Sequence, residues 1–289
     1  MSLFEKRRRN SPQSSLIDDL STLSDGPLGE GPAGWKVAAA GTALLVLAAG
    51  VGAGVLKGQR AAEENARNPS TLCLEKGLPP VSTLALLDVT DRLAADSGDR
   101  FTRLVQRLRD DLPRNARLTI VPFADDLGQS LAPAIDICSP GRGEEANGSF
   151  EGPGRIQRAY ETKFQAPLQR IAQRLSDTGA SANSPIAEQI VRAASDPAIS
   201  WSGTRRELTL FTDGLQNTPS SRVYSTGAVR LPPPPPGILQ GVTVNYIELT
   251  NPRHNALQSA QVRLAWKAWF EAAGAERVRM FAPGFPPPA

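Results

Sequence analysis

An uninterrupted apolar run at residues 37–56 constrains this chain more than any other feature. These twenty residues contain no charged side chain, and a helix of that length spans the roughly 30 Å hydrocarbon core of a bilayer. Basic residues are more numerous before the run than after it, with Lys6, Arg7, Arg8, Arg9 and Lys36 against Lys57 and Arg60. Because cytoplasmic flanks carry the excess of positive charge, the sequence predicts a single-pass signal anchor that leaves residues 58–289 exported.

A cleaved signal peptide is the alternative interpretation of this segment. The small residues Ala48, Ala49 and Gly50 would suit a cleavage site. However, the polar leader at residues 1–34 is long for a signal peptide, and the apolar run exceeds the usual stretch of about 7–15 residues. The sequence favours an uncleaved anchor. Within it, Gly50 and Gly54 have the GxxxG spacing of helices that pack closely in membranes, which makes homodimerisation through this face a further hypothesis.

Composition narrows the compartment and the partners. Apart from the N-terminal arginine cluster, which suits a lipid surface, the basic residues are dispersed and the formal net charge is only +3. Nothing resembles a nucleic-acid groove. Abundant Ala, Arg and Pro with scarce Lys are typical of a GC-rich bacterial genome, so we expect an inner-membrane protein with a periplasmic or extracellular domain. His254 is the only histidine, which argues against structural zinc and His-dependent catalytic triads.

The two cysteines, Cys73 and Cys138, both fall on the exported side of the predicted anchor. Two cysteines in an oxidising compartment usually pair. A bridge over this separation would stabilise the fold by about 4 kcal/mol in the chain-entropy description. The alternative is two separate buried thiols.

The chain divides into five segments by composition. Polar, Ser/Gly/Pro-rich sequence without apolar periodicity predicts a disordered tail, and about 230 residues after the anchor suffice for one domain with its own core. The expected segments are a disordered cytoplasmic tail (1–34), a transmembrane helix (35–57), a juxtamembrane linker (58–81), one globular domain (82–283) and a Pro-rich C-terminal tail (284–289).

Within the globular domain, continuous apolar runs alternate with helical patterns. We expect buried strands at 83–88, 117–123, 207–211, 242–249 and 277–281, and an edge strand at 131–138. We expect helices at 100–112, at 155–175 with a bend at Pro167, from Ser184 with Pro185 in the first position, and at 256–273. This alternation predicts an α/β fold with a doubly wound, mostly parallel sheet and helices on both faces. Ligands of such sheets bind beyond the carboxyl ends of the strands.

Polar clusters fall at that edge. Asp88, Thr90 and Asp91 follow the first buried strand, Ser184 opens a helix, and Asp213 lies in a Thr-Asp-Gly sequence after another buried strand. On these motifs and on the strand order, residues 82–283 resemble a von Willebrand factor A domain, the fold shared with integrin I domains. If the edge strand at 131–138 pairs antiparallel there, the predicted disulfide lies at the base of the sheet, opposite these clusters.

The resemblance implies a metal-ion-dependent adhesion site. By position, Asp88 matches the first-loop aspartate, Thr90 the first hydroxyl, Ser184 the second-loop threonine and Asp213 the third-loop aspartate. Mg²⁺ prefers octahedral oxygen ligands and keeps several waters, and these side chains offer two carboxylates and two hydroxyls. In the family, an acidic residue of a partner protein completes the metal site, so the resemblance implies a protein partner of that kind.

One departure makes the predicted site degenerate. The second serine of the family pattern falls at Arg92, which cannot ligate a cation. Asp91, absent from the pattern, would compensate by ligating or by pairing with Arg92. An ordinary structural interpretation also remains open, in which Asp88 and Asp213 accept backbone hydrogen bonds at strand ends and Ser184 caps a helix.

Three functions are compatible with these residues. The leading hypothesis is an exported binding module, not an enzyme, that recruits or senses a protein partner in an envelope complex. The second is a hydrolase in which Mg²⁺ at the same edge activates a water. The third is an assembly scaffold whose site binds nothing. A dehalogenase-like phosphatase is disfavoured because Thr90 occupies the position of its acid/base aspartate, and no P-loop motif occurs.

Overall fold

A computed structural model of the chain describes residues 66–91, 95–146, 152–175, 181–199 and 201–282, together with Gln59 and Glu63. The predicted anchor with Gly50 and Gly54, the tail at 1–34, Arg92 and the tail at 284–289 lie outside these residues. Among the described helices, none combines the length and the apolar character needed to cross a bilayer.

Six strands form one sheet in the order β3-β2-β1-β4-β5-β6. The strands are β1 (Val81–Asp88), β2 (Arg117–Phe123), β3 (Ile135–Cys138), β4 (Arg205–Thr212), β5 (Val242–Glu248) and β6 (Arg277–Phe281). Every neighbouring pair is parallel except β2 and β3, which are antiparallel. The predicted mostly parallel sheet with an antiparallel edge strand is confirmed. The edge strand begins at Ile135 rather than at residue 131, and Pro133 therefore lies before the strand and not within it.

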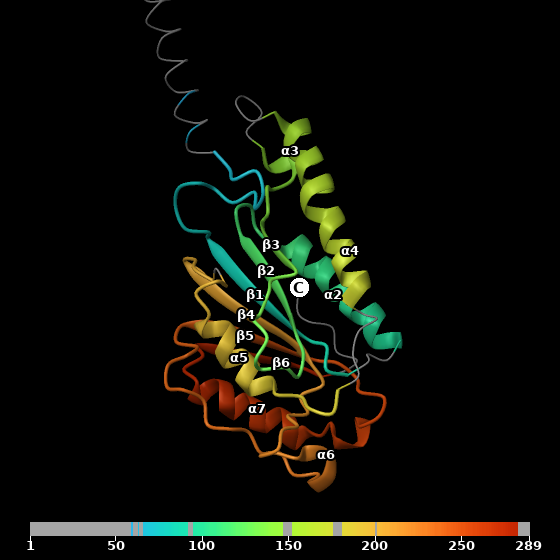
Figure 1. Cartoon of the computed structure of the whole chain (residues 1–289). Helices are drawn as coiled ribbons and strands as arrows, with labels where there is room; N and C mark the ends of the chain where they lie inside the picture. Colours follow the sequence, from blue (N-terminus) through green and yellow to red (C-terminus); the bar gives the residue numbers. More distant parts are fainter. Residues whose placement is uncertain are drawn as a thin grey trace, which may run out of the picture. The chain divides into compact units, whose positions relative to one another are not determined.

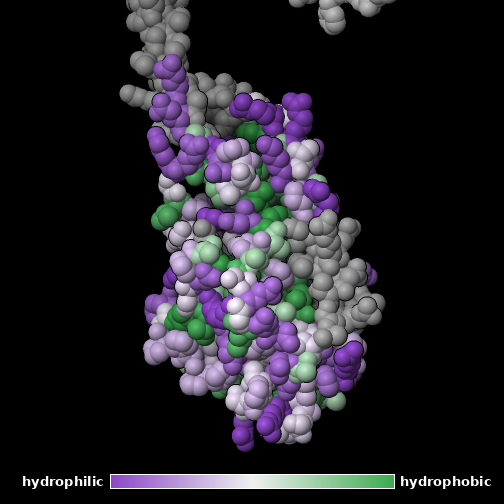
Figure 2. Space-filling model, viewed as in Figure 1, coloured by the Kyte–Doolittle hydropathy of each residue, from purple (hydrophilic) through white to green (hydrophobic). Residues whose placement is uncertain are grey.

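Helices cover both faces of this sheet. The helical segments are α2 (Ala95–Asp111), η2 (Gly143–Glu145), α3 (Pro153–Ala159), the π-helical η3 (Tyr160–Gln165), α4 (Ala166–Leu175), α5 (Ile186–Ser195), α6 (Val223–Thr226), η4 (Asn255–Leu257) and α7 (Ala260–Ala272). Helices α2 and α4 lie on one side of the strands and α5 and α7 on the other (Figure 1). On the surface in view, hydrophobic residues form separate patches among hydrophilic ones (Figure 2).

The hydrophobic core consists of two clusters separated by the sheet. All eight residues of β1 are buried, as expected for a parallel strand covered on both faces. Successive side chains alternate between the faces. Leu84 and Leu86 therefore join the cluster under α5 and α7, which includes Trp266. Leu87 joins the opposite cluster with Phe101 of α2 and aromatic residues of η3.

Two helices differ from their predicted bounds. Helix α2 starts at Ala95 rather than at residue 100. The long helix predicted at 155–175 is interrupted by the π-helical segment η3, which ends just before Pro167. Pro167 has no N–H to donate to the preceding turn of a regular helix. The wider π-helical turn before it is compatible with this missing donor. This turn buries both Tyr160 and Phe164.

Helix α7 also starts later than the predicted residue 256. Ser259 is its N-cap, and the Ser259 Oγ accepts a hydrogen bond from the Val262 amide. The preceding residues form the short 3₁₀ helix η4. The Gln258 side chain fastens this turn, because its Nε2 donates to the carbonyl of Leu249 at 2.7 Å and its Oε1 accepts from the amide of Asn251 at 2.8 Å. These contacts hold residues 255–258 outside the helix, so α7 begins four residues later than predicted.

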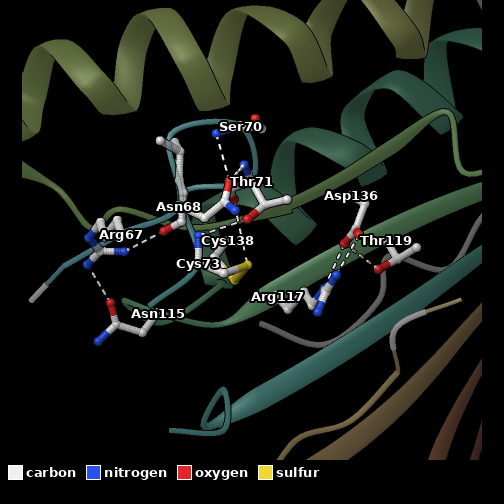
Figure 3. The surroundings of a disulfide bond; sticks show 11 residues. Arg67, Asn68, Ser70, Thr71, Cys73, Asn115, Arg117, Thr119, Asp136 and Cys138 are labelled. Atoms are coloured by element: carbon white, nitrogen blue, oxygen red, sulfur yellow. Dashed lines mark hydrogen bonds and ion pairs between the residues drawn. A yellow bond between two sulfur atoms is a disulfide. The ribbon is translucent and has the colours of Figure 1, made fainter. Parts of the chain in front are cut away.

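The predicted disulfide between Cys73 and Cys138 is present (Figure 3). Cys138 pairs with Arg117, the first residue of β2, so the bridge lies at the base of the sheet, as expected. The linker is fastened there by backbone as well, since the Cys138 amide donates to the carbonyl of Thr71 at 2.7 Å. Asn68 holds the turn by accepting from the amides of Ser70 and Thr71. The part of the predicted linker that is described therefore packs as part of the domain.

Candidate functional site

The candidate site is centred on Asp88, the last residue of β1. Its carboxylate is buried and accepts three hydrogen bonds from Thr90 and Thr212, besides a longer one from Ser184. Oδ1 accepts from the amide and the hydroxyl of Thr90, at 3.0 and 2.6 Å, and Oδ2 accepts from the Thr212 hydroxyl at 2.7 Å. Thr212 ends β4, the strand next to β1. The carboxyl ends of two neighbouring strands thus hold this acid, and the contribution of Thr212 was not predicted.

Ser184 lies against this acid from a distant part of the chain. Its hydroxyl oxygen is 3.1 Å from the Thr90 Oγ1 and 3.5 Å from the Asp88 Oδ2. Ser184 does not begin a helix, and that prediction is wrong. An antiparallel bridge with Asn217 holds its backbone instead, and α5 begins at Ile186.

The helix start has a different partner from the one expected. The side chain of Gln216 accepts a hydrogen bond from the amide of Ala187, in the first turn of α5, at 2.9 Å. Pro185, predicted at the first helical position, is the N-cap residue. Because Gln216 satisfies the first turn, the Ser184 hydroxyl is left to face Asp88 and Thr90.

Asp213 joins the site through a second set of contacts. Its Oδ1 accepts from the amide of Leu215 at 2.8 Å, and its Oδ2 accepts from the side-chain amide of Asn251. The same Asn251 nitrogen lies 3.0 Å from the Asp91 Oδ2, which also accepts from the Tyr224 hydroxyl at 2.8 Å. Asn251 therefore bridges two acids. Neither Asn251 nor Tyr224 was predicted, although Asn251 follows β5 at the same edge of the sheet.

The site concentrates negative charge in a buried place. Burial raises the pKa of Asp88, and the hydrogen bonds from Thr90 and Thr212 offset only part of that effect. Burial and then the neighbouring charge of Asp88 raise the pKa of Asp213 to about 7. Burial and the Asp213 charge likewise raise the pKa of Tyr224. A raised carboxyl pKa means that the ionised form is under-compensated, so the site favours a proton or a cation.

A small pocket lies between these acids. It has a volume of about 10 Å³ and is lined in part by Asp88, Thr90, Asp91, Asp213 and Asn251. That is on the order of the room one water requires. Within the described residues, no group of three or more His, Cys, Asp or Glu side chains is placed to hold a metal. The hard oxygen donors present, including the Thr90 and Ser184 hydroxyls, fit a Mg²⁺ ion that keeps much of its water.

Gly214 makes the sharp turn after Asp213, and replacing it tests how tightly the site is built. Its φ is +74°, and an added Cβ would lie 2.0 Å from the Tyr246 hydroxyl oxygen. We expect Gly214→Ala to lower the free energy of unfolding by about 2–4 kcal/mol, through backbone strain and overpacking together. Urea denaturation measures this.

Gly237 provides the matched control for this substitution. Its φ is +72°, and a Cβ there would meet nothing within 4 Å. Gly237→Ala should therefore show only the backbone strain, about 1–2 kcal/mol. Equal losses for the two variants would mean that Tyr246 does not press on the turn.

Comparison with known proteins yields structural likeness only. No known family profile and no curated protein matches the chain. Its structure is similar to an aerotolerance-related membrane protein from Bacteroides fragilis, at 16% identity over 71% of this chain and 92% of that one, with a TM-score of 0.35. It is similar to BatB from Bacteroides thetaiotaomicron at 14% identity, over 70% and 91% of the chains, TM-score 0.38. Human Sec24c of the COPII coat matches at 13% identity, over 73% and 30%, TM-score 0.38.

Proposed function

We propose that this chain is a membrane-anchored, exported protein-binding module of a bacterial envelope, and that it binds a partner without catalysis. The observation that carries the proposal is the contact of Asp88, Thr90 and Ser184, whose oxygens converge at one strand end from segments more than ninety residues apart. The buried, under-compensated carboxylate of Asp213 belongs to the same pocket. Such an arrangement suits a cation-supported contact.

The electrostatics indicate how a partner would be held. Mg²⁺ at the pocket would offset the charges of Asp88 and Asp213 and keep both ionised. A carboxylate from the partner would then complete the coordination. The Asp91 carboxylate is held by hydrogen bonds from Tyr224 and Asn251. It would therefore lie near the ion without replacing the serine ligand that the family pattern has at position 92.

The placement of the site supports a role in reaching a partner. Asp88 pairs with Phe123 at the carboxyl end of β2, whereas the disulfide-bonded Cys138 pairs with Arg117 at its amino end. The segment that leads from the proposed anchor is thus fastened at one end of the sheet and the acidic pocket lies at the other. A domain tethered in this way would present the pocket away from the inner membrane.

The size of the pocket favours binding over hydrolysis. A metal-dependent hydrolase must hold a substrate beside the metal-bound water. The volume of about 10 Å³ between the acids leaves room for roughly one ion or water. We therefore infer that any larger group approaches from outside the pocket, as a partner's side chain would.

Thermal unfolding with and without millimolar Mg²⁺ tests the proposal. The 289-residue chain should gain several degrees in Tm, because a ligand that binds only the folded state stabilises it. Asp88→Asn and Ser184→Ala should lose most of that gain. Glu276→Gln makes the same acid-to-amide change at an exposed residue of the opposite edge and should keep it.

Recovery of a partner from membranes then separates the possible roles. A partner captured in Mg²⁺, and lost in chelator or with Asp88→Asn, supports the binding module. Turnover of ester or phosphoester substrates that depends on Asp88 would replace it with the hydrolase. If Mg²⁺ shifts the Tm of wild type and Asp88→Asn equally, or not at all, the site is not a cation site and a scaffold role remains.

A further inference from the structure

Residues 232–236 are five consecutive prolines in the connection between α6 and β5. Proline fixes its own φ at about −65° and restricts the residue before it to extended conformations. A run of prolines therefore adopts the polyproline II helix, which has three residues per turn and no internal hydrogen bonds. Such a helix keeps its shape without a partner, and its rings and carbonyl groups stay available to one.

The proline run is fixed to the domain at both ends. Before it, Leu231 packs against the core cluster under α5 and α7, and the carbonyl of Pro232 accepts a hydrogen bond from the Trp269 Nε1 at 2.7 Å. After it, Leu239 is fully buried, and its amide donates to the carbonyl of Ala273 at 2.9 Å. The prolines between these contacts are thus held beside the C-terminal end of α7.

Exposure along this segment follows the three-residue period of a polyproline helix. Three of its residues are partly buried, namely Leu231, Pro232 and Pro234, and three are exposed, namely Pro233, Pro235 and Pro236. Leu231 and Pro234 are one turn apart and form the edge that packs on the domain. Pro233 and Pro236 are one turn apart on another edge, which faces solvent.

The solvent-facing edge offers the groups that proline-binding grooves recognise. Among the described residues, none donates a hydrogen bond to the carbonyls of Pro233, Pro234 or Pro236. Arg230 lies one turn before Pro233, is exposed, and forms no ion pair with any other residue that the structure describes. Polyproline helices dock in grooves lined by aromatic side chains, and an acid beside such a groove would pair with this arginine.

Packing alone does not account for the exposed prolines. A plain connection between α6 and β5 requires the anchored residues, but not the rings of Pro233 and Pro236, because these lie outside the packed edge. For binding, the same rings are an advantage, since a preformed helix loses little conformational entropy when a partner docks.

We propose that residues 230–236 form a docking surface for a second protein partner, whose groove is lined by aromatic side chains and carries an acidic residue opposite Arg230. None of the residues of this surface lines the acidic pocket. The surface is therefore separate from that pocket and does not depend on what the pocket binds.

Competition for a captured partner tests this surface. The immobilised 289-residue chain is incubated with a detergent extract of whole cells, and the retained proteins are challenged with the free peptide Arg-Leu-Pro-Pro-Pro-Pro-Pro-Gly. We expect the peptide to release a protein and to change the tryptophan fluorescence of that protein after purification, because aromatic side chains would contact the prolines. Pro233→Ala combined with Pro236→Ala should weaken retention about tenfold, since both outward rings are lost.

Pro197→Ala is the matched control, because it makes the same change at an exposed proline after α5, and it should keep full retention. Replacing an exposed proline gives the unfolded chain more freedom, so the double variant should show about twice the small Tm loss of Pro197→Ala and stay folded. If the peptide releases no retained protein, or if the double variant retains the partner as well as wild type, the segment is only a rigid connection. A partner that is lost with Asp88→Asn and is indifferent to the peptide belongs to the acidic pocket and contradicts the proposal.

Discussion

Replacing Cys73 by serine is expected to lower the free energy of unfolding by about 4 kcal/mol. The bridge to Cys138 closes a separation of 65 residues, and the entropy that it removes from the unfolded chain grows with the logarithm of that length. For a domain of this size the corresponding loss in Tm is on the order of 10 °C. Denaturant unfolding under oxidising conditions measures it.

Reduction provides the control for this variant. Wild-type protein in excess reductant should fall to the stability of Cys73→Ser, while the variant itself should not respond to reductant. The backbone contact between Cys138 and Thr71 would remain available in both. A loss of less than about 1 kcal/mol would mean that the unfolded chain stays compact even without the disulfide, so that the bridge removes little entropy from it.

The sheet was predictable because its strands are buried on both faces. Residues 81–87 and the buried part of β4 are continuous runs without a charged side chain, a pattern typical of parallel strands that are covered on both faces. The pairing of the two cysteines was also predicted, whereas the edge strand β3 was expected at 131–138 and begins only at Ile135. The anchor at residues 37–56 remains a prediction.

The helix ends were less predictable because distant side chains set them. Gln216 supplies the acceptor at the first turn of α5, and Gln258 holds the turn before α7. Gln216 is distant from α5 in the sequence, and Gln258 directly precedes the N-cap of α7 but binds residues that follow β5. Ser184-Pro185 has the local appearance of a helix start, yet its contact with Asn217 is tertiary and takes precedence over the local preference.

For the candidate site, the strand ends were the useful signal. Asp88, Thr90 and Ser184 lie in contact with one another, and Asp213 lines the same pocket. Asn251 was missed because amides carry no distinctive motif, although it follows β5 in the same way that Asp213 follows β4. Whether these side chains bind Mg²⁺ is a matter of proton and cation affinity, which no sequence pattern reports.

Stability should therefore depend on pH in a direction set by Asp213. Burial and the neighbouring charge of Asp88 raise its pKa from the ordinary 3.8 of an aspartate to about 7 in the folded state, so the folded state holds an extra proton between these values. The free energy of unfolding should then fall as pH rises from about 4 to about 7, by up to roughly 4 kcal/mol in divalent-free buffer. The raised pKa of Asp88 acts in the same direction.

Asp213→Asn should remove most of this slope. Asparagine offers one acceptor oxygen to the two donors that contact Asp213, the Leu215 amide and the Asn251 side chain. The lost hydrogen bond costs stability at every pH, so the slope between pH 5 and pH 8 is the quantity to compare. Glu276→Gln should keep the wild-type slope. Mg²⁺ should flatten the wild-type curve at high pH, because a bound cation favours the ionised carboxylates, and should do little to Asp213→Asn. A wild-type curve that rises over this interval would mean that Asp213 is already ionised and compensated by charges of the protein itself.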